Sequence, residues 1–327
     1  MPTEKAVPPP PRPLDRSSVE AVAELAEAVR DNLCRVVLGK ADPIRLALVA
    51  LLSGGHLLVE DTPGVGKTLL SKALAVSVGG TFGRVQGTPD LLPGEVTGVN
   101  VFHPEHASWE FRPGPLFAHV VLVDEINRAT PRTQSALLEA MEERQVTVDG
   151  DSRPLPDPFF LVATQNPFEH AGTFPLVEGQ RDRFGVVLHL GHPDRPAERD
   201  LLLGTGGTGS LDTLEPVSDP AGLVKAIATV REVHCEPSVA DYVIDIAAAT
   251  RDHRDVVRGA SPRASLGLLH AAKAEAAMAG RPFVVPDDVK AVAGPALAHR
   301  IVLVGGPDFH AGAELVHGVV DALPVPR

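Results

Sequence analysis

One stretch of the sequence restricts the possible folds more than any other. Residues 56–70 read His-Leu-Leu-Val-Glu-Asp-Thr-Pro-Gly-Val-Gly-Lys-Thr-Leu-Leu. The apolar run from Leu57 to Val59 is typical of a buried parallel strand, and a turn rich in proline and glycine follows it. A helical pattern then runs from Thr68 to about Val78. Strand, glycine loop and helix, in this order, form a site where backbone N–H groups and the positive end of a helix face one point. The stretch therefore predicts a polyphosphate site.

The side chains of this loop fit a nucleoside triphosphate. Gly64 and Gly66 let the backbone approach phosphate oxygens without a side chain in the way. Lys67 supplies a cation for the β- and γ-phosphates, and the hydroxyl of Thr68 is a candidate ligand for Mg²⁺. The strict pattern begins with glycine, whereas this chain has Asp61 there, a residue type that tolerates unusual backbone angles. The predicted nucleotide-binding residues are Gly64, Val65, Gly66, Lys67, Thr68 and Leu69.

Two further apolar runs end in polar side chains. Residues 120–123 are followed by Asp124 and Glu125, and residues 159–163 are followed shortly by Asn166. Ligands of open α/β sheets bind at the carboxyl ends of the strands. There Asp124 could hold Mg²⁺ through water, and Glu125 could orient or deprotonate the attacking water. Acidic residues that only cap the next helix, and a turn-forming asparagine before proline, are the structural alternatives.

Arginines in two later segments are candidates for binding an anion. Residues 177–184 contain Arg181 and Arg183. Another helix begins Ser261-Pro262-Arg263, with a good cap and proline at its first position. Arg263 then lies in the first turn, where a cation opposes the helix dipole at a cost of about 0.3–1 kcal/mol. That cost indicates a position chosen for an anion, and pairing with a nearby acid is the alternative.

Composition excludes several classes of protein. The chain has 327 residues, enough for two domains with a sizeable core, and its formal charge of −12 does not suit a binder of polyanions. Its two cysteines, Cys34 and Cys235, lie far apart within apolar patterns, which is typical of cytosolic proteins rather than of a disulfide framework. No apolar run approaches the ~20 residues of a membrane span. We therefore expect a soluble, cytoplasmic protein.

The chain divides into three predicted parts. Residues 1–16 are rich in proline and predict a disordered tail. Residues 17–205 predict an α/β nucleotide-binding core, with a glycine- and proline-rich elaboration at 87–118 that contains a small hairpin around residues 96–102. A second hairpin is predicted at 145–148 with its turn at Asp149-Gly150. Residues 206–327 predict a helical domain. The glycine run at 204–209 matches the dinucleotide fingerprint GxGxxG only in letters, because it follows a helix and no helix begins after it.

The order of these motifs resembles the AAA+ ATPases and, more narrowly, the MoxR family. The stretches that carry the resemblance span nearly the whole chain after the proline tail: residues 54–60, 64–68, 111–117, 123–129, 134–143, 163–167, 182–184 and 261–263. The resemblance implies an α/β, three-layer P-loop NTPase core with a parallel five-stranded sheet, a C-terminal α-helical lid domain, and a nucleotide between the two. It also implies ATP and Mg²⁺ as cofactors, the latter held by Thr68 and Asp124.

The same resemblance assigns roles to the polar residues. Asn166 is similar to the first sensor, Arg263 to the second sensor, and Arg183 to an arginine finger supplied by the neighbouring subunit. Arg181, two residues before Arg183, is the rival for the finger, and whether Arg263 acts in its own subunit or in the next stays open. A homo-oligomeric ring, hexameric by the pattern of the family, is implied.

Three functions are compatible with these motifs. The first is an ATPase that remodels or assembles protein partners, as MoxR-like proteins are thought to do, alongside a partner with a von Willebrand factor A domain. The second is a nucleic-acid motor, which needs basic hairpin tips. The tip here reads Asp149-Gly150-Asp151 with only Arg153 nearby, so nucleic acid is not expected. The third is a monomeric kinase, against which the lid and the arginines argue, because a kinase needs no arginine from a neighbour.

Overall fold

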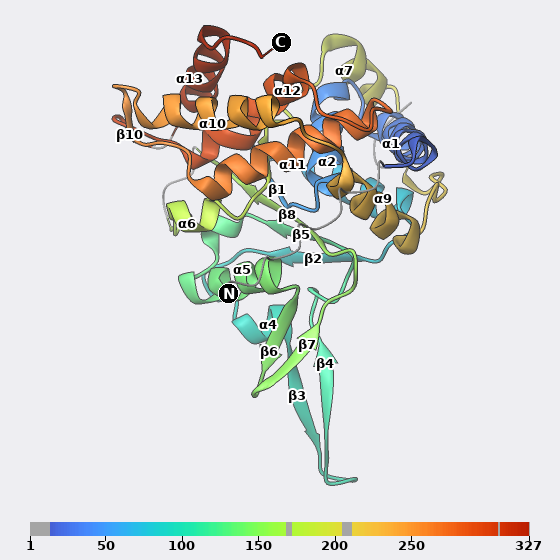
Figure 1. Cartoon of the computed structure of the whole chain (residues 1–327). Helices are drawn as coiled ribbons and strands as arrows, with labels where there is room; N and C mark the ends of the chain where they lie inside the picture. The colour runs from blue at the N-terminus through green and yellow to red at the C-terminus, as the bar shows by residue number, and fades with distance from the viewer. Residues whose placement is uncertain (1–13, 168–171, 205–210, 307, 327) are drawn as a thin grey trace, which may run out of the picture.

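The computed structural model describes residues 14–167, 172–204, 211–306 and 308–326 (Figure 1). Almost all of the tail predicted at 1–16 and of the glycine run at 204–209 lies outside these ranges, as does the predicted boundary between residues 205 and 206. Within them, the predicted α/β fold with a parallel five-stranded sheet is confirmed. The strands, in spatial order, are β2 (Phe82–Gln86), β5 (Val120–Asp124), β8 (Phe160–Gln165), β1 (Leu57–Glu60) and β9 (Val186–Leu188).

The sheet is covered on both faces, which explains the continuous apolar runs of β5, β8, β1 and β9; the edge strand β2 instead alternates. Along β1, the side chains of Leu57 and Val59 join one hydrophobic cluster and that of Leu58 joins another on the opposite face. Helices α1 (Arg16–Val36), α2 (Ala41–Leu52) and α3 (Lys67–Ser77) contribute to the first cluster, and α5 (Pro131–Glu143) contributes to the second. The result is three layers, with the carboxyl ends of the parallel strands at one edge.

Helices dominate the C-terminal part, as predicted. They are α7 (Arg195–Leu202), α9 (Pro220–Glu232), α10 (Pro237–Arg251), α11 (Pro262–Met278), α12 (Pro286–Leu297), the 3-10 turn η2 (Ala298–Arg300) and α13 (Phe309–Ala322). The buried apolar side chains of α9, α10, α11, α12 and α13 belong to the same cluster as those of α1 and α2. The lid helices therefore pack onto the core through a continuous hydrophobic interior.

The expectation of helices alone after about residue 219 is incomplete. Strands β10 (Val256–Arg258) and β11 (Val302–Leu303) form a small antiparallel pair, and α13 was not predicted. These strands are two and three residues long, too short for an alternating pattern, and the side chain of Val257 is exposed. Their pairing joins segments more than forty residues apart, which no local pattern reveals.

Two hairpins project together from the sheet, opposite the lid helices (Figure 1). One follows α4 (Pro93–Thr97) and consists of β3 (Gly98–His103) and β4 (Ser108–Pro113). The hairpin expected near 96–102 thus contains only the first of these strands, because Gly98 pairs across to Pro113. The other consists of β6 (Gln145–Val148) and β7 (Asp151–Pro154), as predicted around the Asp149-Gly150 turn.

Contacts between side chains brace the two hairpins. The amide of Asn100 donates to a carboxylate oxygen of Asp149 at 2.8 Å, and the guanidinium of Arg153 lies 4.0 Å from the centre of the Phe111 ring. The cation nearest the acidic tip is therefore held against an aromatic face. None of the helices in the described ranges is both long and apolar enough to cross a lipid bilayer.

A buried histidine fixes the strand that leads into the glycine loop. His56 directly precedes β1. Its Nδ1 accepts from the backbone N–H of Leu161 in β8 at 3.0 Å, which leaves Nε2 to donate to the carbonyl of Met141 in α5 at 3.0 Å. The ring is thus neutral and satisfied on both sides. Burial is the main cause that lowers its pKa to about 4.

We expect His56 to make the stability of the fold depend on pH. The folded state keeps the ring neutral down to a pKa of about 4, whereas the unfolded chain binds a proton near its ordinary value of 6.5. The contribution is therefore complete above pH 6.5, declines as the pH falls, and is lost below about pH 4. Between about pH 7 and about pH 5 the free energy of unfolding should fall by about 2 kcal/mol through this residue.

Urea unfolding of the wild-type protein and of His56→Gln at both pH values measures this difference. Glutamine can still donate and accept a hydrogen bond but has no proton to gain, so the variant should lack that part of the decline. His299 is also buried, and burial lowers its pKa too. It therefore makes the free energy of unfolding fall with falling pH in both proteins alike. An equal pH dependence in the two proteins would show that His56 is not the titrating group.

Candidate nucleotide-binding site

A cavity of about 630 Å³ lies at the carboxyl edge of the sheet, where the glycine loop follows β1. It brings together every predicted loop residue with Asp124, Glu125 and Asn166. Its lining consists of Val36, Val37, Leu38, Lys40, Pro63, Gly64, Val65, Gly66, Lys67, Thr68, Leu69, Arg84, Gln86, Asp124, Glu125, Thr164, Asn166, Pro193 and Leu201. The motifs converge because β1, β5 and β8 are adjacent parallel strands that end at the same edge.

The glycine loop is shaped to receive phosphate. Gly66 has a φ of 100°, a left-handed conformation that favours glycine, and it directly precedes α3. A Cβ atom at Gly64 or Gly66 would meet no protein atom within 4 Å, because both positions face the open cavity. No side chain caps the start of α3. The N–H groups of its first turn are therefore suited to an anion.

Lys67 points back toward the start of the loop. Its Nζ donates to the carbonyl of Asp61 at 2.8 Å. Burial lowers its pKa, and the charges of Asp61, Asp124 and Glu125 act in the opposite direction. A cation that is partly desolvated and surrounded by acids is well placed to exchange a carbonyl for a phosphate oxygen, because the anion restores the solvation that burial removed.

The aspartate at the first position of the loop is accommodated by its backbone. Asp61 is not among the described residues with positive φ, so the position does not require glycine. One carboxylate oxygen accepts from the N–H of Gly191 at 2.7 Å and the other from the N–H of Thr62 at 2.9 Å. The carboxylate thus ties the opening of the loop to the segment that follows β9.

Glu125 is held in an unusual conformation at the end of β5. Its φ of 55° and ψ of 51° are left-handed, which is rare for a residue with a side chain. The hydroxyl of Thr164 accepts its N–H at 2.9 Å, and its carboxylate accepts from Gln86 and Arg128, each at 3.2 Å. At Gly87 a Cβ would lie 2.2 Å from the carbonyl oxygen of Glu125, so glycine permits this close approach. Strained geometry of this kind often marks functional positions.

Asp124 is paired with a side chain that the sequence analysis missed. Its Oδ2 accepts from Nη2 and Nε of Arg84 in β2, at 2.7 and 2.9 Å, and its Oδ1 lies 3.5 Å from the hydroxyl of Thr164. Arg84 and Gln86 alternate along β2 and so lie on the same face of the strand. That alternation was a detectable signal, but only the pairing of β2 with β5 shows what the two side chains contact.

A second group of missed residues forms an apolar side of the cavity. Val36, Val37 and Leu38 come from the end of α1 and the turn after it, and Pro193 and Leu201 come from the segment around α7. Apolar walls next to a phosphate loop suit the base of a nucleotide. Sequence analysis assigned both segments only to helices, since their apolar residues satisfy a helical pattern equally well.

The residues present fit both a nucleoside triphosphate and a magnesium ion. The loop offers a cradle of backbone N–H groups and a lysine. The hydroxyl of Thr68 and the carboxylate of Asp124 line the same cavity and are oxygen ligands of the kind that Mg²⁺ prefers. The fold and this site define the class of the protein as a P-loop nucleotide-binding protein.

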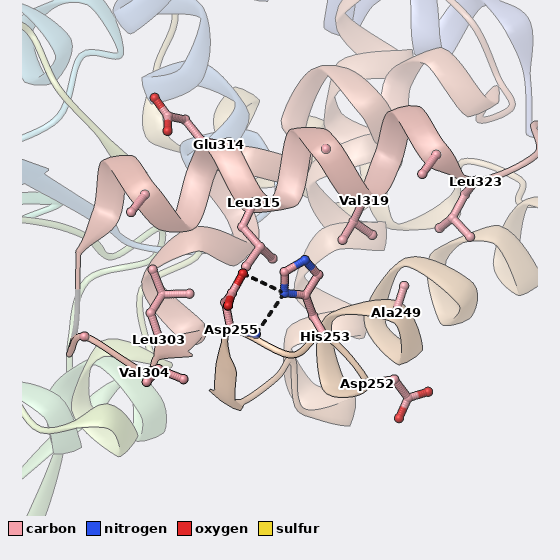
Figure 2. Close-up of a pocket in the computed structure, with 14 residues that line it drawn as sticks. Ala249, Asp252, His253, Asp255, Leu303, Val304, Glu314, Leu315, Val319 and Leu323 are labelled. Atoms are coloured by element: carbon pink, nitrogen blue, oxygen red, sulfur yellow. Dashed lines mark hydrogen bonds and ion pairs between the residues drawn. The ribbon is translucent and has the colours of Figure 1, made fainter.

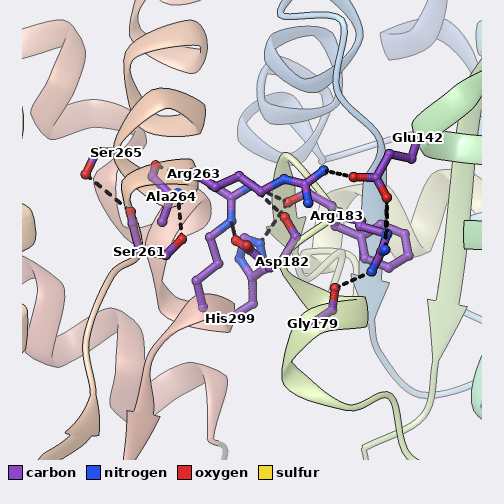
Figure 3. A network of polar contacts seen from close by, with 11 residues as sticks. Glu142, Gly179, Asp182, Arg183, Ser261, Arg263, Ala264, Ser265 and His299 are labelled. Carbon is purple, nitrogen blue, oxygen red and sulfur yellow. Dashed lines mark hydrogen bonds and ion pairs between the residues drawn. The ribbon is translucent and has the colours of Figure 1, made fainter.

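Arg183 and Arg263 do not line this cavity. Instead both bind the carboxylate of Glu142 at the end of α5: Nη2 of Arg183 at 2.9 Å and Nη2 of Arg263 at 2.8 Å (Figure 3). The bond from Arg263 is the main cause that lowers the pKa of Glu142. Within the described residues, no side chain from α9 to α13 lines the nucleotide cavity. The expected position of the nucleotide between core and lid of one subunit is therefore not what this chain presents.

The segment that carries the predicted finger is fastened to the lid. Arg300 of η2 is buried, and burial lowers its pKa to about 10. Its Nη2 donates to the carbonyl of Phe184 at 2.8 Å, and its Nε lies 3.1 Å from the carboxylate of Asp182. His299 donates to the same carbonyl of Phe184 at 2.9 Å. These bonds fix the backbone on which Arg183 stands.

Arg181 has different surroundings. Its side chain lines another cavity, of about 650 Å³, together with Glu60 from the end of β1. Burial lowers the pKa of Arg181, while the charge of Glu60 opposes that shift. The two arginines of the segment thus face opposite environments: Arg181 an interior carboxylate, and Arg183 the surface beside Arg263.

Another cavity, of about 890 Å³, lies between α13, the end of α10 and β11 (Figure 2). Its floor is apolar, formed by side chains such as Leu303, Leu315 and Val319, and carboxylates of Asp255 and Glu314 stand at its edge. No lysine or arginine lines it among the described residues. Such a cavity does not suit a phosphate, whatever its size.

Comparisons with known proteins show the family of the chain. Residues 56–186 match the family model described as ATPase family associated with various cellular activities (AAA), and residues 248–317 match that of the AAA lid domain. The chain is 45% identical to the uncharacterized protein YeaC of Bacillus subtilis over 304 residues, 92% of this chain and 95% of the relative. It is 41% identical to the chaperone MoxR1 of Mycobacterium tuberculosis over 278 residues, 82% of this chain and 73% of the relative.

A solved structure gives the same result. A putative ATPase from Cytophaga hutchinsonii is 32% identical, superposes with a TM-score of 0.85, and the match covers 95% of this chain and 98% of that one. The chain belongs to the MoxR family of AAA+ ATPases.

Substitutions at two positions separate binding from turnover. Lys67→Ala removes the cation that is predicted to face the β- and γ-phosphates, so we expect nucleotide binding to fall by at least about a hundredfold, a loss of roughly 3 kcal/mol. Glu125→Gln keeps the size of the side chain but cannot take a proton, so binding should persist while ATP hydrolysis stops. Binding of a fluorescent ATP analogue and phosphate release measure the two effects. Hydrolysis at the wild-type rate in either variant would refute the role assigned to that residue.

Proposed function

We propose that this chain binds and hydrolyses ATP and uses the reaction to remodel or assemble protein partners. The observation that supports hydrolysis most strongly is the convergence of five predicted groups on one cavity: Lys67, Thr68, Asp124, Glu125 and Asn166. They come from three adjacent strands, and no two of these strands are consecutive in the chain.

In this proposal each side chain has a separate task. The glycine loop and Lys67 grip the β- and γ-phosphates, and Thr68 and Asp124 hold Mg²⁺, which supplies charge neutralisation between the phosphates. Glu125 orients a water molecule and accepts its proton as the oxygen attacks the γ-phosphorus. Asn166, at the end of β8, binds the γ-phosphate or the attacking water. The left-handed backbone of Glu125 supports this role, because it directs the carboxylate away from the strand and into the cavity.

We further propose that Arg183 and Arg263 both act on the nucleotide of the neighbouring subunit. Both lie outside the cavity of their own chain and share Glu142, so two cations are balanced by one carboxylate. That surplus of positive charge suits a polyphosphate from outside. Arg181 is the weaker candidate for the finger, because it lines an interior cavity beside Glu60. Arginines that work across an interface require a second subunit, and a ring in which every subunit has a neighbour supplies one at each site.

A protein is the favoured client. A relative that is 41% identical carries the name chaperone, and the hairpin tip is acidic, with Arg153 held over a ring. These observations favour protein over nucleic acid, because nucleic-acid motors need free cations at such tips. A second partner with a von Willebrand factor A domain is part of the proposal through the family resemblance. The cytoplasm is the proposed location.

Mixing two inactive variants tests whether Arg183 acts across the interface. Glu125→Gln has an intact finger and a dead site, whereas Arg183→Ala has an intact site and no finger. If the finger comes from the neighbour, about a quarter of the interfaces in a randomly mixed ring combine both intact parts. We therefore expect ATP hydrolysis to reappear on mixing, to roughly a quarter of the wild-type rate. The same design with Arg263→Ala tests the second arginine.

Two controls decide the assignment. Arg181→Ala should retain hydrolysis on its own, because its guanidinium faces Glu60 in its own core. A mixture that stays inactive would place Arg183 in its own subunit. An inactive Arg181→Ala that recovers on mixing with Glu125→Gln, together with an active Arg183→Ala, would instead identify Arg181 as the finger.

A further inference from the structure

Strand β2 presents two polar side chains to the two carboxylates that end β5. Gln86 pairs with Asp124 in the parallel register, and Arg84 lies two residues earlier on the same face. Across this edge, Arg84 contacts Asp124 and Gln86 contacts Glu125. The acidic pair is therefore already engaged by the neighbouring strand.

The pair between Arg84 and Asp124 is unequal in exposure. The side chain of Asp124 is 11% exposed, whereas that of Arg84 is 50% exposed and lines the nucleotide cavity. Two N–H groups of Arg84 reach Oδ2 of Asp124, and Thr164 lies near Oδ1. A mostly buried carboxylate thus depends on a guanidinium that remains open to the cavity. Buried carboxylates require such a partner, because a lone charge is costly to desolvate.

Both bonds from Arg84 end on Oδ2 of Asp124, so a divalent cation that takes this oxygen competes with the guanidinium. The guanidinium would have an alternative partner in a loaded site. It lines the same cavity as Lys67 and Thr68, where phosphate oxygens would lie, and a planar guanidinium binds phosphate as well as carboxylate. In a loaded site the guanidinium of Arg84 would therefore have two possible acceptors, the carboxylate of Asp124 and a phosphate of the nucleotide.

We propose that Arg84 is an exchangeable counter-ion: it pairs with Asp124, releases that carboxylate to a divalent cation, and then binds the terminal phosphate of the nucleotide. This inference rests on the proposed function of the same cavity. It makes Arg84 a determinant of specificity for a nucleoside triphosphate over a diphosphate. With a triphosphate, the guanidinium exchanges one anion for another. A diphosphate has no γ-phosphate, so the guanidinium releases Asp124 without gaining that anion in return.

The test compares the binding of two nucleotides to Arg84→Gln in the presence of Mg²⁺. Dissociation constants for ADP and for a non-hydrolysable ATP analogue are measured by calorimetry on the full chain. Without Arg84, Asp124 is free for the cation, so ADP should bind more tightly. The ATP analogue loses a phosphate contact and should bind more weakly. We expect opposite shifts that together lower the preference for the triphosphate by about tenfold or more.

Three further measurements make the outcome decisive. Arg84→Lys keeps the charge but not the fork, so it should retain part of the preference. Arg254→Gln is the matched control, because that side chain is 91% exposed and pairs with Asp255 away from the cavity, and both affinities should be unchanged. Thermal unfolding checks that each variant is folded.

The possible failures are distinguishable. If Arg84→Gln is folded and both nucleotides shift in the same direction by the same factor, or neither shifts, Arg84 is only a structural partner of Asp124 and the inference is overturned. If the wild-type chain binds neither nucleotide, the proposed function itself fails.

Discussion

The proposed site depends on the place of β1 in the sheet, with β8 on one side and β9 on the other. A parallel strand in this position is buried on both faces and can carry only apolar side chains, so its first polar residues appear where it ends. The glycine loop then begins at the edge of the sheet where β5 ends with Asp124 and where Asn166 follows β8. His56 fixes this arrangement from the opposite end, because its ring bonds to β8 and to α5 at once. A shift of β1 by one residue would break both bonds and move the loop.

The cations that are predicted to act on a nucleotide, at the cavity and away from it, are paired inside the chain. Lys67 donates to the carbonyl of Asp61, Arg84 to Asp124, and Arg183 and Arg263 to Glu142. Hydrogen bonds to charged groups contribute about 1.5–3 kcal/mol each, so binding that exchanges one partner for another changes the free energy by much less than the bonds themselves. Selectivity for a nucleotide then depends on how many of these internal partners one ligand replaces with its own phosphate oxygens. A triphosphate, with its larger charge, replaces more of them than a smaller anion.

The sequence was sufficient for the parts of the site that lie on continuous motifs. The glycine loop, Asp124, Glu125 and Asn166 each follow an apolar run, and the end of an apolar run marks the edge of a buried sheet. Arg84 and Thr164 could not be assigned in the same way. Their partners are 40 residues away in the chain, and the contacts follow from which strands are neighbours, a property of the whole sheet.

The partners of Arg183 and Arg263 could not be predicted from the sequence for the same reason. The cap and proline before Arg263 predicted its helix correctly. No helix was predicted at residues 177–184, where the structure has the short helix α6 (Glu178–Arg181). Neither stretch of sequence contains the acidic residue that its arginine binds. Glu142 lies 121 residues from Arg263 and 41 from Arg183, and only the packing of the lid on the core brings the three together. The alternative that Arg263 pairs with a nearby acid is what the structure contains, although that acid is near only in space.

One consequence follows from how the lid is attached. Helix α11, which begins next to Arg263, packs against α1, and the end of α1 supplies Val36 and Val37 to the apolar side of the nucleotide cavity. Contacts therefore run without interruption from the base side of one cavity, through α1 and α11, to an arginine on the surface. In a ring, that arginine would face the phosphate of the next subunit. A nucleotide that displaced the end of α1 would act on an element that joins its own site to the helix that carries Arg263, and a tightly packed interior transmits such a shift rather than absorbing it.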